Sequence, residues 1–327
     1  MIIVTGGAGF IGSYLVGELS DKGIGPIVVC DRLRDGGKWK NIAKHNVADI
    51  INPDNLMEWL ESNGQNVDCI FHLGAISTTT ETDADFIWRN NVQFTQNLWD
   101  WCARNQARLI YASSAATYGD GKLGFEDDQN LEAINKLQPL NPYGWSKKVS
   151  DQRAIQMATA GYAPRQWAGL KFFNVYGPNE YHKGGQESVA VQLFNKIKQD
   201  GEAVLFKSHH PDYEDGGQMR DFVWVGDVVN VMLWLYENHQ TSGIFNCGSG
   251  KARSFKDLAL AVFKAMDLEP KISYRDTPEH IRKHYQYFTE ANMQKLRAEG
   301  YDHNGTSLED GVSEYVRKYL ATEDWYR

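Results

Sequence analysis

Residues 1–12 read MIIVTGGAGFIG, a short apolar run followed by a glycine-rich turn and a second apolar run. The first run, Ile2 to Thr5, consists of β-branched residues, which are typical of a strand buried on both faces. The spacing from Phe10 to Lys22 predicts a helix. Glycine tolerates the backbone angles of the tight turn between them. This strand, turn and helix predict the first unit of a parallel α/β sheet.

The same alternation continues through the first half of the chain. Strands are expected at 27–31, 68–73, 108–113 and 166–173, and helices at 83–104 and 142–159. This order predicts a Rossmann-type doubly wound parallel sheet with a smaller, mostly α substrate-binding domain. Similar runs between residues 221 and 246 resume the rhythm after a break. We therefore expect a dinucleotide-binding domain at 1–175 and 221–250, and a discontinuous substrate domain at 176–220 and 251–327.

The glycine turn has the G-x-G-x-x-G spacing of a dinucleotide loop, with Gly7, Gly9 and Gly12 in the three positions. Such a turn brings the backbone and the helix N-terminus close to a pyrophosphate. Asp31 ends the next strand, where an acid that binds the adenosine ribose is expected. Arg32 beside it suits the 2′-phosphate of NADP. We expect NADP rather than NAD; the alternatives are a turn without a ligand and a solvated surface arginine.

A proton-transfer site is predicted at Tyr143 and Lys147, which lie four residues apart in one predicted helix. Residues at this spacing share a helix face, so the lysine charge favours the phenolate and lowers the tyrosine pKa. The hydroxyl of Ser114, in the run Ser113 to Gly119, would orient a substrate oxygen. Such a group removes a proton from an alcohol while a nicotinamide accepts the hydride.

Composition excludes several other classes of protein. The net charge of −8 over 327 residues argues against a nucleic-acid binder. No apolar run is long enough to span a bilayer, and no signal sequence precedes the first strand, so a cytoplasmic protein without a membrane partner is expected. The four cysteines are interpreted as small buried residues. His72 has no second ligand nearby and is interpreted as a core histidine, so no metal site is expected.

The motifs together resemble the extended short-chain dehydrogenase/reductase family. The resemblance rests on the glycine turn, on Ser114 to Tyr118, on the Tyr143-x-x-x-Lys147 pair, and on the stretches 174–178 and 220–223. A narrower resemblance covers nearly the whole chain and is to the ADP-glyceromanno-heptose 6-epimerases. It rests on segments 2–7, 111–119, 172–178, 182–184, 188–190 and 285–289.

This narrower resemblance implies an isomerase. Its members invert C6 of ADP-D-glycero-β-D-manno-heptose to the L-glycero form for lipopolysaccharide core synthesis, through transient oxidation to a 6-ketone and re-reduction with tightly bound NADP. It also implies a homo-oligomer, with a pentamer as the expected form. The alternative is an NAD(P)-dependent epimerase or oxidoreductase on another nucleotide sugar, such as a hexose 4-epimerase. A 4,6-dehydratase is disfavoured because Ala115 and Ala116 stand where those enzymes usually carry Asp-Glu.

The resemblance also implies roles for individual residues. Tyr143 and Lys183 would be the two acid/base groups. Lys147 would hold the nicotinamide ribose, and Ser114 would orient the reacting oxygen. The implied cofactor contacts are Gly6, Gly9, Phe10, Ile11, Gly12, Asp31, Arg32, Lys38, Leu73, Gly74, Ala75, Ile76, Ser77, Asn90, Lys147, Val175 and Lys183. The implied substrate contacts are Asn174, Gly185, Gln192, Phe206, Lys207, Ser208, His209, Arg220 and Tyr285.

Overall fold

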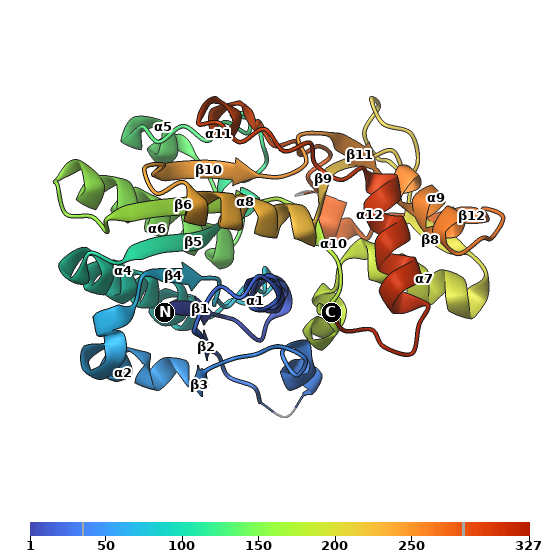
Figure 1. Cartoon of the computed structure of the whole chain (residues 1–327). Coiled ribbons are helices and arrows are strands. Elements are labelled where there is room, and N and C mark those ends of the chain that lie inside the picture. Colours follow the sequence, from blue (N-terminus) through green and yellow to red (C-terminus); the bar gives the residue numbers. More distant parts are fainter. Residues whose placement is uncertain (35, 283–284) are drawn as a thin grey trace.

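A seven-stranded parallel sheet forms the centre of the larger part of the molecule (Figure 1). The computed structural model describes residues 1–34, 36–282 and 285–327. The strand order is β10-β6-β5-β4-β1-β2-β3, and every neighbouring pair is parallel. The strands are β1 (Ile2–Thr5), β2 (Ile27–Cys30), β3 (Asp49–Ile51), β4 (Cys69–His72), β5 (Arg108–Ser114), β6 (Gln166–Phe172) and β10 (Gly243–Cys247).

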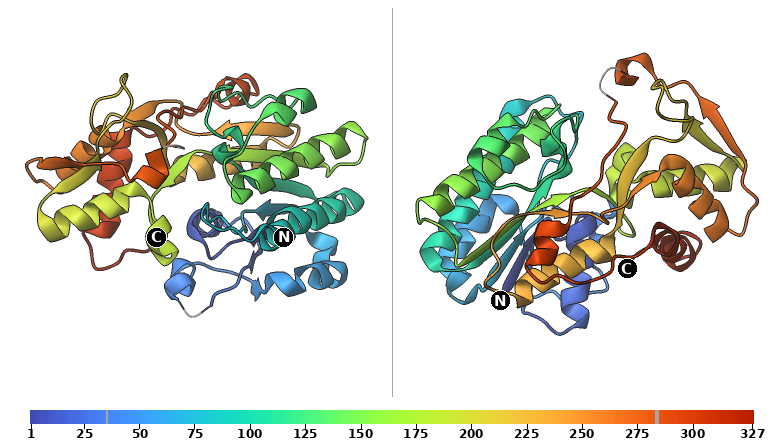
Figure 2. Two further views of the ribbon diagram at one scale, coloured as in Figure 1. Left: turned by 180° about the vertical axis from the view of Figure 1, so that it is seen from behind. Right: turned by 90° about the horizontal axis from the view of Figure 1, so that it is seen from above.

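Helices cover both faces of this sheet (Figure 2). Successive strand residues point to opposite faces, so Ile2 and Val4 join one apolar cluster while Ile3 joins the other. The first cluster includes α1 (Phe10–Asp21) and α8 (Val225–Glu237). The second includes α2 (Leu56–Asn63), α4 (Phe94–Asn105) and α6 (Pro142–Thr159). The predicted doubly wound fold class is therefore confirmed.

A smaller region lies beside the sheet and combines helices with two small sheets (Figure 1). Its main helices are α7 (Val189–Asp200), α9 (Phe255–Ala265) and α12 (Leu308–Tyr315). Strands β8 (Ala203–Phe206) and β12 (Ile272–Arg275) pair in parallel. Strands β7 (Asn174–Tyr176), β9 (Met219–Trp224) and β11 (Ala252–Ser254) form a three-stranded sheet. The domain boundaries stay a prediction, although β10 does return to the large sheet.

Shorter helices complete the described chain. They are α3 (Ala84–Ile87), α5 (Leu131–Lys136), α10 (Glu279–Arg282) and α11 (Gln294–Ala298). Among the described residues, no helix combines the length and the apolar character that crossing a membrane requires.

The helix predicted at 83–104 is interrupted. Between α3 and α4 the chain forms a π-helical turn at Trp88–Gln93. Such turns insert one extra residue per turn and are frequent at functional sites. Here the turn carries Asn91, whose amide bonds both backbone groups of Ile76 and donates to the Ser146 hydroxyl. The interruption therefore ties the segment after β4 to α6.

We predict that Leu170→Ala lowers the free energy of unfolding by about 2–5 kcal/mol, because a fully buried leucine leaves a cavity when truncated. Leu170 lies in β6 and is 0% exposed. Leu260→Ala is the matched control, since Leu260 is 38% exposed. Urea unfolding of both variants checks the prediction. Equal losses for the two variants would contradict the assigned core.

Candidate active site

A cavity of about 490 Å³ opens at the carboxyl edge of the large sheet. In parallel α/β sheets this edge is where ligands bind. The cavity brings together the glycine turn, the end of β5, the start of α6 and the segment that carries Lys183. All four candidate catalytic residues line it: Ser114, Tyr143, Lys147 and Lys183.

The glycine turn can adopt its tight backbone only with glycine at positions 6 and 12. Gly6 has φ +67°, and a Cβ there would lie 2.6 Å from the Gly74 nitrogen. A Cβ on Gly12 would lie 2.2 Å from the Gly6 carbonyl oxygen. Gly9 is the N-cap of α1 and offers no side-chain cap. The first amides of α1 therefore keep donors for an anion, as a pyrophosphate requires.

A second cavity of about 770 Å³ adjoins the first and shares Gly6, Asp31 and Lys38 with it. Asp31 accepts hydrogen bonds from the Ala8 amide at 2.9 Å and from the Lys38 ammonium at 2.5 Å. Arg32 lines this cavity and forms an exposed ion pair with Asp54 at 2.6 Å. Arg34 and Arg89 also line this cavity. The basic side chains outnumber the two carboxylates, which favours an anionic ligand there.

The start of α6 positions the Tyr143 and Lys147 pair. Asn141 caps the helix by accepting from the Gly144 amide at 2.8 Å, and Pro142 occupies the first turn. The Lys147 ammonium donates to the Ala112 carbonyl of β5 at 2.6 Å. Burial lowers the Lys147 pKa to about 8. This lysine is thus anchored to the strand that ends at Ser114.

Burial also raises the pKa of Tyr143, and a hydrogen bond with Ser114 opposes that rise. The Lys147 ammonium lies 6.0 Å from the centroid of the Tyr143 ring. Ser114 itself caps a 3₁₀ turn by accepting from the Ala116 amide at 3.1 Å. The pair identified by sequence spacing shares one cavity, but the expected lowering of the Tyr143 pKa by Lys147 is not found, because burial is the largest influence on the phenol and raises its pKa.

Lys183 lies on the 3₁₀ segment Tyr181–Gln186 and is not an ordinary surface lysine. Its ammonium lies 4.8 Å from the centroid of the Phe10 ring. Burial lowers its pKa, while the nearby Glu180 and Glu187 carboxylates raise it. Glu180 is 0% exposed and is held by Ser188 and by Tyr315 of α12. A half-buried amine of this kind is suited to proton transfer.

The predicted cofactor contacts divide between the two cavities. Arg32, Ile76 and Asn90 line the second cavity. The first is lined by Gly6, Gly9, Phe10, Ile11, Gly12, Asp31, Lys38, Leu73, Gly74, Ala75, Ser77, Lys147, Val175 and Lys183.

The predicted substrate contacts are more dispersed. Asn174 lines the first cavity, and Tyr285 lines a separate cleft of about 580 Å³. Arg220 lies 5.5 Å from the Tyr285 ring, and no described carboxylate forms an ion pair with it; Asp221 bonds Ser249 and backbone amides instead. Seven predicted contacts line none of these three cavities: Gly185, Gln192, Phe206, Lys207, Ser208, His209 and Arg220.

Several lining residues were missed by sequence reasoning. His182 lines both cavities, and Gln186, Glu187 and Ser188 line the first. They surround Lys183 in the chain, so their proximity to that residue was the available signal. The Ala112 carbonyl that anchors Lys147 carried no signal, because every residue has the same backbone group.

Comparison with known proteins identifies the family. A profile described as the NAD dependent epimerase/dehydratase family matches residues 2–248. The chain belongs to this family. It is 49% identical over 334 residues to a protein of Fusobacterium nucleatum named ADP-L-glycero-D-manno-heptose-6-epimerase, covering 100% of both chains. A protein of the same name from Nitratidesulfovibrio vulgaris is 51% identical over 326 residues, covering 99% of both.

A solved structure supports the same assignment. The ADP-L-glycero-D-manno-heptose-6-epimerase of Helicobacter pylori superposes with a TM-score of 0.79 at 26% identity, covering 97% of this chain and 95% of that one. The resemblance identified from sequence motifs is therefore confirmed. Members of an NAD dependent epimerase/dehydratase family bind a dinucleotide, and the uncapped start of α1 behind the tight glycine turn fits its pyrophosphate.

His72 holds Thr5, the residue immediately before the glycine turn. Its two ring nitrogens bond the hydroxyls of Thr5 at 2.7 Å and Thr95 at 2.8 Å, and Thr5 also accepts from the Gly74 amide. The interpretation of His72 as a satisfied core histidine is confirmed. Burial lowers its pKa to about 3, with a smaller contribution from the Lys147 charge.

We predict that His72 makes the free energy of unfolding fall as the pH is lowered. In the unfolded chain the His72 ring takes up a proton near pH 6.5, whereas in the folded chain it does so only near pH 3. Stability contributed by the neutral ring is therefore present above about pH 6.5 and falls by about 1.4 kcal/mol per pH unit below it. His72→Gln removes this slope. Urea unfolding of both proteins between about pH 4.5 and about pH 6 measures it; parallel slopes would contradict the assignment.

Proposed function

We propose that the protein inverts C6 of ADP-D-glycero-β-D-manno-heptose to give the L-glycero epimer. The observation that carries this proposal is the combination of two full-length relatives of that name at about half identity with one cavity containing both Tyr143 and Lys183. Two proton-transferring groups suit a reaction in which the reacting oxygen presents itself in two orientations. The product would serve lipopolysaccharide core synthesis.

The chain's own residues handle the proton and the oxygen. A nicotinamide cofactor held by the glycine turn and by Lys147 would supply hydride transfer from C6 and back to it. Tyr143, or Lys183 in the other orientation, takes the hydroxyl proton as the 6-ketone forms and gives it back on reduction. Ser114 donates a hydrogen bond to the reacting oxygen. Lys147, held by Ala112, keeps a positive charge beside the phenol.

We further propose NADP as the cofactor. Lys38 neutralises Asp31, the acid that would otherwise favour the unmodified ribose of NAD. Arg32, Arg34 and Arg89 surround the same cavity. This charge pattern supports a 2′-phosphate. Because each turnover regenerates the cofactor, it is expected to remain bound through purification, and mass spectrometry of the released nucleotide identifies it.

We predict that Tyr143→Phe lowers kcat for epimerisation about 10²- to 10⁴-fold, the usual contribution of a positioned acid/base group. The fold should be unchanged because the aromatic ring remains and only the hydroxyl is removed. Chromatography of the two ADP-heptose epimers measures the rate. Tyr162→Phe is the matched control, since Tyr162 is 40% exposed and outside the cavity. Full activity in the Tyr143 variant would refute the assigned role.

We predict that Lys38→Ala weakens NADPH binding about 10- to 100-fold, the loss expected for one charge-assisted hydrogen bond. NADH binding should change less, because freeing Asp31 leaves it able to bind a ribose hydroxyl. Fluorescence titration of cofactor-stripped protein measures both affinities. Lys40→Ala, on the same turn but stacked near Tyr326, is the control. An equal loss for both cofactors would argue against a 2′-phosphate site.

A further inference from the structure

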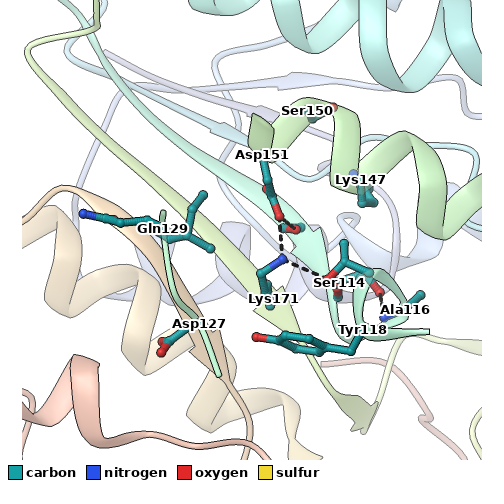
Figure 3. A network of polar contacts seen from close by, with 12 residues as sticks. Ser114, Ala116, Tyr118, Asp127, Gln129, Lys147, Ser150, Asp151 and Lys171 are labelled. Carbon is teal, nitrogen blue, oxygen red and sulfur yellow. Dashed lines mark hydrogen bonds and ion pairs between the residues drawn. The ribbon is translucent and has the colours of Figure 1, made fainter. Parts of the chain in front are cut away.

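A buried polar network lies close to Ser114 and Lys147, two of the candidate catalytic residues (Figure 3). Its centre is an ion pair between Lys171 of β6 and Asp151 of α6, 2.6 Å apart, with side chains 1% and 0% exposed. The Asp151 carboxylate also accepts from the hydroxyls of Tyr111 at 3.0 Å and Ser113 at 2.7 Å, both on β5. Neither member of the pair lines the cavity.

Lys171 extends the network to the end of β5. Its ammonium donates to the Thr117 hydroxyl at 2.8 Å, and that hydroxyl donates to the Ser114 carbonyl at 2.8 Å. The same ammonium lies 5.1 Å from the centroid of the Tyr118 ring. One buried cation therefore contacts two residues of the 3₁₀ turn after Ser114, namely Thr117 and Tyr118.

Asp151 extends the network along α6. It follows Lys147 by four residues, so the two side chains lie on one helix face, one turn apart. The helix that carries Tyr143 and Lys147 is thus bonded through Asp151 to β5 and β6. With its hydroxyl partners, the ion pair joins β6 to the two elements that carry the candidate residues, β5 with the serine and α6 with the tyrosine and the lysine.

Stability alone is a poor reason for this arrangement. A buried ion pair gains little over apolar side chains of similar volume, because two charges must be taken out of water. The neighbouring strands β5 and β6 are already paired in register, with Ser113 opposite Lys171. What backbone pairing does not fix is the placement of α6 and of the turn after Ser114 relative to the strand ends.

We propose that Asp151 and Lys171 are positioning residues whose buried ion pair holds the catalytic serine, tyrosine and lysine in their working arrangement. The effect on the reaction rests on the function proposed above, whereas the effect on the turn does not. A small displacement in such a site costs rate rather than affinity, since the reacting atoms must be aligned in the transition state.

The test compares two buried cations on the same sheet. Lys171→Met breaks the network behind the site. Arg108→Met removes a second buried cation, also 1% exposed, at the opposite end of β5, where its partner Asp68 is 35% exposed. Both variants are made in the cofactor-containing protein. Both are assayed at one temperature that lies well below the thermal midpoint of either variant. Lys171→Met should lower kcat about 10- to 100-fold with KM within about twofold, while Arg108→Met keeps kcat within about twofold.

A double variant, Asp151→Asn with Lys171→Met, covers the case in which the single variant does not fold. It leaves no unpaired buried charge, so it should recover stability but not kcat. Wild-type kcat in the double variant, or equal losses in the Lys171 and Arg108 variants, would overturn the proposal.

Hydrogen–deuterium exchange separates this proposal from the proposed function. Peptides covering residues 112–119 should exchange faster in Lys171→Met than in Arg108→Met, whatever the substrate. A wild-type protein that does not epimerise ADP-heptose would remove the proposed function, and the exchange comparison would still test the network. Unchanged exchange in residues 112–119 would overturn the positioning role.

Discussion

Parallel pairing in register is the constraint on which the site depends. Thr5 lies opposite His72 in β1 and β4, and His72 lies opposite Tyr111 in β5. Strands β1 and β4 end at this level, whereas β5 continues for three residues, to Ser114. The serine therefore stands beyond the level at which the glycine turn begins. In the proposed reaction, a cofactor bound at the turn and a substrate oxygen at Ser114 would therefore lie at different levels along the strands.

Buried cations set the electrostatics of this acidic protein. The chain carries a net charge of −8, yet Lys147 and Lys171 are almost fully buried and Lys183 is half-buried at the cavity. Each is handled differently. A carbonyl holds Lys147, a carboxylate neutralises Lys171, and nearby acids oppose the desolvation of Lys183. Lys147 and Lys183 make the cavity locally basic on an acidic protein, which suits an anionic ligand.

Much of the site was predictable because it lies in short stretches of chain. The glycine turn follows from backbone sterics, and the Tyr143 and Lys147 pair follows from helix periodicity. The interruption of the helix at 88–93 was not predictable, since no proline or glycine marks it. The short strand β3 was missed because its first two residues are exposed and only Ile51 is buried. The hydrophobic pattern of a short segment indicates which of its residues are buried, so a segment that is only partly buried shows a weak pattern.

The sequence by itself determined the type of unit and the identity of the chemical groups. It specified strands, a dinucleotide turn and a tyrosine with a lysine one turn away, because these depend on neighbours in the chain. Only the tertiary structure decided which partners those groups meet. Asp31 meets Lys38, Lys147 meets the Ala112 carbonyl, and Asp151 meets Lys171. The last two contacts join residues of different secondary-structure elements, so no spacing along the chain encodes them. Their burial also strengthens them, and burial too is decided by the tertiary structure.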